Sequence, residues 1–217
     1  MDKIENPSEQ HELFSINPVV VLQFLTSYEC ERLLNFFQIG EKESGKLRGA
    51  DRRLNDGPPE IIRNNTVCWM KLTEDTFWIY EKITNLINEL NANKYQFDIT
   101  GLQTIQLAEY TAENHQGGQF YKSHIDTCMS GWADSQRKLS LTVQLTPPEN
   151  YEGGNLLLFG DKNDMVLNPS NFSKNIQQRR EFGAAIIFPS FLEHEVTPVT
   201  KGTRHSLVAW MEGPNWK

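Results

Sequence analysis

The chain has 217 residues, 38% of them hydrophobic, and a formal net charge of −7. This length fits one domain with a substantial core, because single domains usually hold roughly 100–200 residues. The acidic balance disfavours a nucleic-acid partner, which would need a basic stripe, and no stretch approaches the roughly 20 apolar residues that span a bilayer.

The cysteines and the N-terminal segment indicate the cellular setting. The three cysteines, at positions 30, 68 and 128, are odd in number and widely spaced, which argues against a disulfide scaffold or a zinc knuckle. Residues 1–18 are polar and lack the apolar segment of a signal peptide. We therefore expect a reducing, cytoplasmic environment.

Helical patterns dominate the first hundred residues. After a strand-like apolar run at 19–24, the segment Thr26 to Glu29 has the form of a capping box and predicts a helix start. Residues 44–59 predict a loop and residues 66–72 a strand. A longer helix is predicted to begin at Thr73, because apolar residues then recur at three- and four-residue steps. These are Phe77, Tyr80, Ile83, Leu86, Ile87 and Leu90.

From residue 100 onward the apolar period changes to two, which is typical of strands separated by turns. The predicted strands are 102–109, 139–145, 155–159, 182–188, 193–199 and 204–211. Helices followed by a run of short strands predict an α+β domain whose strands close or stack to hide their edges, as in a jelly roll. We expect one domain over 1–217, with a helical support at 1–100 and a β core at 101–217.

The triplet His124-Ile125-Asp126 is the candidate metal motif. On a strand, an imidazole and a carboxylate two residues apart point to the same face. A distant histidine would complete the two-histidine, one-carboxylate triad that holds Fe(II) with positions open for a co-substrate and O₂. His194, which opens a short strand after an apolar strand and a turn, is that candidate. Ten positions later, Arg204 offers a forked donor array suited to a carboxylate.

The remaining histidines are expected to lie outside the site. His11 is in the polar N-terminal segment and His115 is in a loop, so both are predicted to be exposed. His205 follows Arg204 on the opposite strand face and is predicted to be structural. The H-x-D triplet arises by chance in many proteins, so the metal assignment depends on the whole set of residues around it.

That set extends over residues 102–216. It comprises Tyr110, Gly118 to Asp126, Arg137 to Ser140, Pro148 to Gly154, Phe188 to Val199, Gly202 to Arg204, and Trp210. In order and spacing these residues resemble the Fe(II)/2-oxoglutarate dioxygenases, specifically the prolyl 4-hydroxylase-like branch and its bacterial PKHD-type members. The resemblance implies a double-stranded β-helix (jelly-roll) core with supporting N-terminal helices.

The resemblance also implies roles for single residues. His124, Asp126 and His194 would bind iron. Arg204 would pair with the C5 carboxylate of 2-oxoglutarate, and Tyr110 would add a hydroxyl donor there.

Two aromatic residues, Tyr121 and Trp210, would line the pocket towards the substrate, with a role as core aromatics as the alternative. Gln144 would face the cavity by alternation. The stretch 162–180 has no match in the resemblance and would form either a lid or a surface loop.

The implied activity is hydroxylation of an unactivated C–H bond with Fe(II), 2-oxoglutarate and O₂, releasing succinate and CO₂. Ascorbate is a further cofactor candidate. Asp126 favours hydroxylation, because related halogenases carry a small residue in its place. A peptidyl proline is the first choice of substrate, since aromatic side chains such as Tyr121, Trp132 and Trp210 suit its ring. The open alternatives are a hydroxylase of free amino acids, a nucleic-acid demethylase and a non-catalytic jelly-roll binding module.

Overall fold

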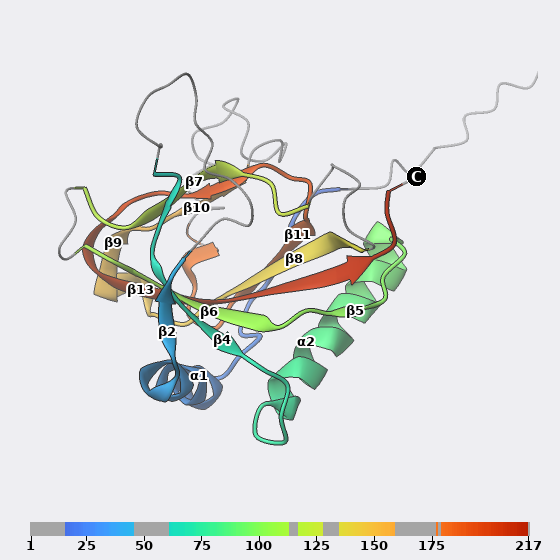
Figure 1. Ribbon diagram of the computed structural model, residues 1–217, viewed down its shortest axis with the longest axis horizontal. Coiled ribbons are helices and arrows are strands. Elements are labelled where there is room, and N and C mark those ends of the chain that lie inside the picture. The colour runs from blue at the N-terminus through green and yellow to red at the C-terminus, as the bar shows by residue number, and fades with distance from the viewer. Residues whose placement is uncertain are drawn as a thin grey trace, which may run out of the picture.

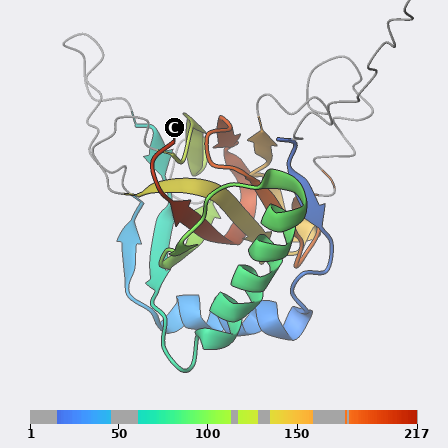
Figure 2. The same ribbon diagram turned by 90° about the vertical axis from the view of Figure 1, so that its right-hand side faces the viewer.

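The computed structural model describes residues 16–45, 61–112, 117–127, 135–158, 177 and 179–216. Within this part, a large and a small antiparallel sheet face each other, and the helices α1 and α2 pack on the outer face of the large sheet (Figures 1 and 2). Among the described residues, no helix has the length and apolar character needed to cross a membrane. The predictions for His11, His115, Trp132 and most of the stretch 162–180 concern residues outside the described ranges.

Helix α1 (Ser27–Ile39) begins where the sequence predicts. The side chain of Thr26 accepts the N–H of Glu29 at 3.3 Å, and the carboxylate of Glu29 accepts the N–H of Thr26 at 2.8 Å. This reciprocal pair satisfies two donors that a helix N-terminus otherwise leaves free, so the predicted capping box is confirmed.

Helix α2 (Phe77–Leu90) begins later than the predicted start at Thr73. The hydroxyl of Thr76 accepts the Thr73 N–H at 2.8 Å and donates to the Lys71 carbonyl at 2.7 Å, which holds the preceding residues in a turn. Phe77 is 54% exposed and does not join the buried stripe. That stripe consists of Ile79, Tyr80, Ile83 and Ile87. A π-helical turn, η1 (Asn91–Tyr95), continues the helix.

The strands form two layers. The order of the large sheet is β1-β11-β8-β13-β6-β4-β2, with β5 and β9 also pairing with β13. Its strands are β1 (Val19–Val21), β2 (Lys42–Ser44), β4 (Thr66–Met70), β5 (Gly101–Leu102), β6 (Ile105–Thr111), β8 (Gln136–Gln144), β9 (Tyr151–Gly153), β11 (Ala185–Pro189) and β13 (Val199–Gly213). The small sheet has the order β10-β12-β7-β3. Its strands are β3 (Arg63–Asn64), β7 (Phe120–His124), β10 (Leu156–Leu158) and β12 (His194–Val196), and a short 3-10 turn, η2 (Pro148–Asn150), precedes β9.

Alternation along the central strands divides the core into two clusters. On β11, Ala185 and Ile187 pack in the cluster under the helices, whereas Ile186 and Phe188 pack in the cluster between the sheets. On β8, the leucine side chains of 139 and 141 pack towards the helices, so the intervening Ser140 faces the small sheet. The large sheet thus presents polar residues to the space between the layers.

Candidate metal centre

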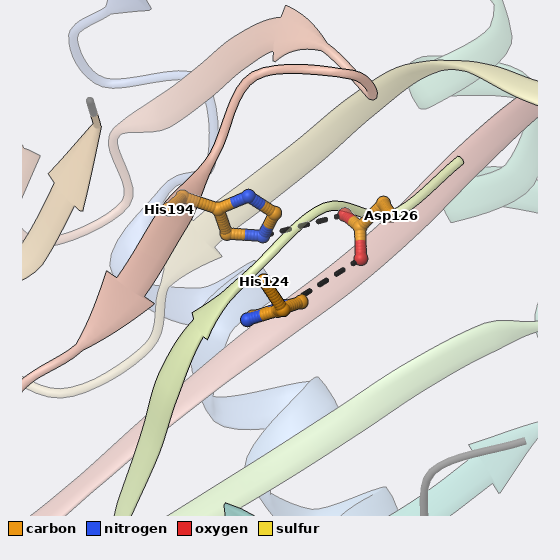
Figure 3. Close-up of side chains that lie close together, drawn as sticks. All are labelled: His124, Asp126 and His194. Atoms are coloured by element: carbon orange, nitrogen blue, oxygen red, sulfur yellow. Dashed lines mark ion pairs between the residues drawn. The ribbon is translucent and has the colours of Figure 1, made fainter. Parts of the chain in front are cut away.

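The three candidate ligands come together between the sheets. Strands β7 and β12 are antiparallel neighbours that place His124 directly opposite His194. The ligand atoms of His124, Asp126 and His194 all lie within 4.8 Å of one another (Figure 3). The Nε2 atoms of His124 and His194 lie 3.7 and 3.5 Å from the two carboxylate oxygens of Asp126.

The predicted reason for this convergence was partly wrong. Strand β7 ends at His124, and Asp126 lies beyond it in a bend. The backbone N–H of Asp126 donates to the Ser190 carbonyl at 2.9 Å, which fixes the bend against the turn that follows β11. A tertiary hydrogen bond, rather than strand alternation, therefore brings the carboxylate to the imidazoles.

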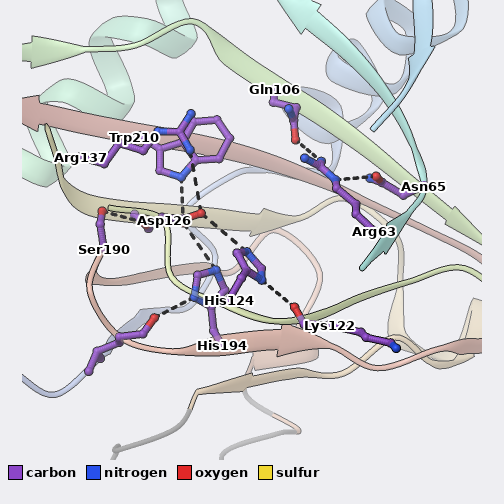
Figure 4. A network of polar contacts seen from close by, with 12 residues as sticks. Arg63, Asn65, Gln106, Lys122, His124, Asp126, Arg137, Ser190, His194 and Trp210 are labelled. Carbon is purple, nitrogen blue, oxygen red and sulfur yellow. Dashed lines mark hydrogen bonds and ion pairs between the residues drawn. The ribbon is translucent and has the colours of Figure 1, made fainter. Parts of the chain in front are cut away.

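Hydrogen bonds set the tautomers of both histidines. The Nδ1 atom of His124 lies 2.8 Å from the Lys122 carbonyl, and that of His194 lies 2.9 Å from the Leu192 carbonyl (Figure 4). A carbonyl oxygen only accepts, so each Nδ1 carries a proton, and Nε2 is the ring nitrogen that each histidine directs towards Asp126 for a metal. Burial and the neighbouring His194 lower the pKa of His124 to about 4, so this ring is neutral at neutral pH, as metal binding requires.

The carboxylate of Asp126 is ionised and held in one orientation. Burial raises its pKa, but the surrounding imidazoles and Arg137 outweigh burial and bring the value to about 2. Its Oδ2 accepts hydrogen bonds from the Ser140 hydroxyl at 2.7 Å and from the Trp210 indole N–H at 2.8 Å. Two imidazole lone pairs and a fixed carboxylate form a donor set that fits Fe(II) with three protein ligands.

The two expected pocket aromatics lie against the triad. Tyr121 stacks on the imidazole of His124, with ring centroids 3.5 Å apart and an interplanar angle of 14°. Trp210 is only 5% exposed, and its indole N–H is directed at the carboxylate of Asp126. Both side chains therefore contact metal-ligand candidates, and Trp210 also lies 6.5 Å from the half-exposed ring of Trp69.

A second polar group surrounds Arg204, which is 2% exposed. Tyr110 is its direct neighbour on β6, with the ring centroid 5.5 Å from the guanidinium carbon. A Cβ atom on Gly154 would lie 2.9 Å from Arg204 Cδ and 3.4 Å from Tyr151 Cε2, so Arg204 and Tyr151 approach each other across this glycine. Burial raises the pKa of Tyr110, which keeps its hydroxyl protonated.

Several buried donors near Arg204 lack partners among the described residues. They are Arg204 Nε, the Tyr151 hydroxyl and Gln144 Nε2, and Gln144 pairs in register with Ser206, whose hydroxyl accepts from Arg204. Buried polar groups are nearly always hydrogen-bonded, so donors left free in one place indicate an acceptor that binds there. A carboxylate fits this requirement.

Several contributors to the site lie in the segments that resemble the family, but the sequence analysis gave them no role. Ser140, Ser190 and Arg137 contact Asp126 or its partners, and Tyr151 lies against the same glycine as Arg204. Ser140 also had a signal of its own, because it is a polar residue in a strand whose alternate residues are apolar.

Comparison with known proteins identifies the family. The model of the 2OG-Fe(II) oxygenase superfamily matches residues 105–212. A PKHD-type hydroxylase from Colwellia psychrerythraea is 31% identical over 191 residues, which cover 88% of this chain and 75% of that protein. The chain belongs to the PKHD-type hydroxylases. Membership in this family implies Fe(II) and 2-oxoglutarate as metal and co-substrate, in agreement with the two polar groups above.

Other PKHD-type hydroxylases match a smaller part of their length. The protein from Gloeothece citriformis is 31% identical over 98 residues, covering 45% of this chain and 40% of that protein. The chain thus spans less than half of the length of this relative.

Solved structures confirm the predicted fold. A prolyl hydroxylase from Trichoplax adhaerens, in complex with a hypoxia-inducible-factor peptide fragment, superposes with a TM-score of 0.64 at 23% identity, covering 91% of this chain and 84% of that one. A prolyl-4-hydroxylase from Pseudomonas putida gives a TM-score of 0.59 at 20% identity, covering 93% of this chain and 94% of that one. The expected α+β double-stranded β-helix is therefore confirmed.

Proposed function

We propose that this PKHD-type hydroxylase hydroxylates an unactivated C–H bond of a peptidyl prolyl residue, releasing succinate and CO₂. One observation carries the proposal. The Nε2 atoms of His124 and His194 and the carboxylate of Asp126 converge within 4.8 Å of one another. A protein built only for binding has no need of two imidazoles and a carboxylate that converge with open coordination positions, so the non-catalytic alternative is disfavoured.

The triad residues would hold the metal, and their neighbours would position them. His124, Asp126 and His194 would occupy three coordination positions, which leaves room for a bidentate co-substrate and O₂. The bound metal and co-substrate supply the oxidising chemistry, with ascorbate keeping the iron reduced. Ser140 and Trp210 would keep one oxygen of Asp126 engaged, so that the other faces the metal.

The far carboxylate of 2-oxoglutarate would bind at Arg204. Its guanidinium is buried and permanently charged, and its free Nε donor together with the Tyr151 hydroxyl would receive the two carboxylate oxygens. Tyr110, packed against the same guanidinium, would add a further donor. We infer that Tyr151, which the sequence did not single out, is part of this pocket.

The prolyl peptide is proposed as substrate on two grounds. Two solved structures that resemble this chain are prolyl hydroxylases, one of them bound to a peptide. In this chain, Trp69 is 41% exposed beside Trp210 and offers an apolar surface next to the triad. Aromatic surfaces suit proline, because its ring is apolar and its backbone loses little entropy on binding. We further propose that residues 1–217 act as one catalytic domain.

The test offers proline-containing peptides beside free L-proline and other free amino acids, with Fe(II), 2-oxoglutarate and ascorbate. We expect a peptide to gain the mass of one oxygen atom in step with succinate release. The variant His194→Ala should lose both products, whereas His205→Ala should retain them, because His205 instead contacts Glu109. Turnover of free amino acids alone would contradict the peptide substrate and leave the hydroxylase assignment intact.

A further inference from the structure

The side chain of Arg63 packs against Tyr121, which in turn packs against the candidate metal ligand His124. It pairs directly with Tyr121 across β3 and β7, and its guanidinium carbon lies 4.7 Å from the centroid of the Tyr121 ring. The same ring stacks on His124. Figure 4 shows Arg63 beside the triad, on the side of Gln106 and Asn65. The guanidinium therefore belongs to the wall of the metal centre.

The guanidinium is held in a fixed orientation by two amides. Its Nε donates to Asn65 Oδ1 at 2.7 Å and its Nη2 donates to Gln106 Oε1 at 2.6 Å. Asn65 and Gln106 are each only 2% exposed, so neither amide can move aside easily. The Nη1 group makes no hydrogen bond to any residue in the described part of the chain. A rigid cation thus retains free donors next to the triad.

Two other guanidiniums lie near the triad, and each has an anion of the chain or of the proposed co-substrate assigned to it. Arg137 Nη1 lies 4.0 Å from Asp126, and its Nε donates to Gln103, which in turn donates to Glu212. Arg204 faces the pocket proposed for the far carboxylate of 2-oxoglutarate. Arg63 has neither: within the described ranges no carboxylate lies within 4.0 Å of its nitrogens, and it takes no part in the proposed 2-oxoglutarate pocket.

Charge balance then indicates what Arg63 binds. Asp126 lies beside Arg137, and the far carboxylate of 2-oxoglutarate would lie beside Arg204, so Arg63 is left without an anion among the described residues and the proposed co-substrate. A partly buried cation is stabilised when an anion joins it away from bulk water. We propose that Arg63 binds a carboxylate of the substrate, adjacent to the carbon that is hydroxylated.

This inference rests on the hydroxylase activity of the proposed function and refines its substrate class. The carboxylate has two possible sources: the side chain of an acidic residue beside the target proline, or the α-carboxylate of a free amino acid. Both present the same planar pair of oxygens to the guanidinium fork. Each source predicts preferential binding of a different probe, so one experiment distinguishes the two sources.

Binding is measured with Mn(II) and a non-reactive 2-oxoglutarate analogue, so that no turnover is needed. The probes are proline peptides with Glu beside the proline, the same peptides with Gln, free L-proline, and L-prolinamide, which lacks the carboxylate. The variants are Arg63→Met, which keeps the aliphatic stem, and Arg63→Lys, which keeps the charge. Arg32→Met is the matched control, because Arg32 covers Trp78 at 4.5 Å on the surface of α1.

If the source is a side chain, the wild-type protein should prefer the Glu peptide to the Gln peptide by about tenfold to a hundredfold, the usual value of a hydrogen bond to a charged group. If the source is the α-carboxylate, the same preference should separate L-proline from L-prolinamide. Arg63→Met should abolish the preference, Arg63→Lys should keep part of it, and Arg32→Met should leave it unchanged. Unaltered affinity for Mn(II) in Arg63→Met shows that the variant still folds.

Equal binding within both probe pairs, with no effect of Arg63→Met, would overturn the carboxylate site. Turnover of the same probes is followed separately by mass. A preference that depends on Arg63 without any hydroxylated product would refute the proposed function and leave the carboxylate site standing. Hydroxylation of the probes without a preference that depends on Arg63 would support the proposed function and refute the carboxylate site.

Discussion

Replacing Trp210 with Phe removes one hydrogen bond to the triad and keeps an aromatic ring for Arg137 to cover. The indole N–H donates to Asp126 Oδ2 at 2.8 Å, and the side chain is 5% exposed, so Phe keeps most of the buried ring. Ser140 still donates to the same oxygen at 2.7 Å, so the carboxylate loses one of its two restraints. Loss of a group that orients a metal ligand typically lowers metal affinity by about 10- to 100-fold, and we expect a value in this range.

The assay is calorimetric titration of Mn(II) into the wild-type protein and Trp210→Phe at neutral pH. Trp69→Phe is the matched control, because Trp69 lies 6.5 Å from Trp210 but its indole donates to Glu43 at 2.8 Å. We expect the control to bind Mn(II) like the wild type. Equal dissociation constants for all three proteins would refute the claim that Trp210 orients Asp126.

Three further predictions concern other residues. Arg204→Lys should raise the KM for 2-oxoglutarate about ten- to a hundredfold in a succinate assay, and an unchanged KM would place the anchor elsewhere. Tyr151→Phe should weaken 2-oxoglutarate binding about three- to tenfold in calorimetry without lowering the melting temperature of the free protein, because the buried hydroxyl is unpartnered there. The hydrogen bond from His205 lowers the pKa of Glu109, so its stabilisation is present above the ordinary glutamate pKa of about 4.3 and is lost as the pH falls below it. In urea unfolding, Glu109→Gln should therefore lose less stability than the wild type as the pH falls from about 5 to about 3, and parallel losses would contradict this assignment.

Local patterns in the sequence predicted the elements that local chemistry determines. The capping box at Thr26 starts α1 through contacts three residues apart, and the alternation on β8 and β13 follows from the pleat of any strand. The order of His124, Asp126, His194 and Arg204, together with the motif residues around them, indicated the family. These features depend on neighbours in sequence or on a spacing that the fold requires.

Features that depend on tertiary contacts escaped prediction. Strand β3 is two residues long and polar, and it exists because Arg63 and Asn64 pair with β7. The bend that brings Asp126 to the triad requires the Ser190 carbonyl, which comes from a distant turn. Arg204 and Tyr151 both pack against Gly154, where a Cβ atom would press on both side chains. No periodicity within the segments themselves encodes these contacts.

The central claim is that the His124, Asp126 and His194 triad supports iron-dependent oxidation of 2-oxoglutarate. The most direct test measures succinate formed from 2-oxoglutarate by the wild-type protein with Fe(II), O₂ and a proline peptide, beside His124→Ala and the control His205→Ala. We predict succinate with the wild type and the control, and none with His124→Ala or after removal of the metal by a chelator. Succinate formation that persists in His124→Ala, or that does not require the metal, would contradict the account.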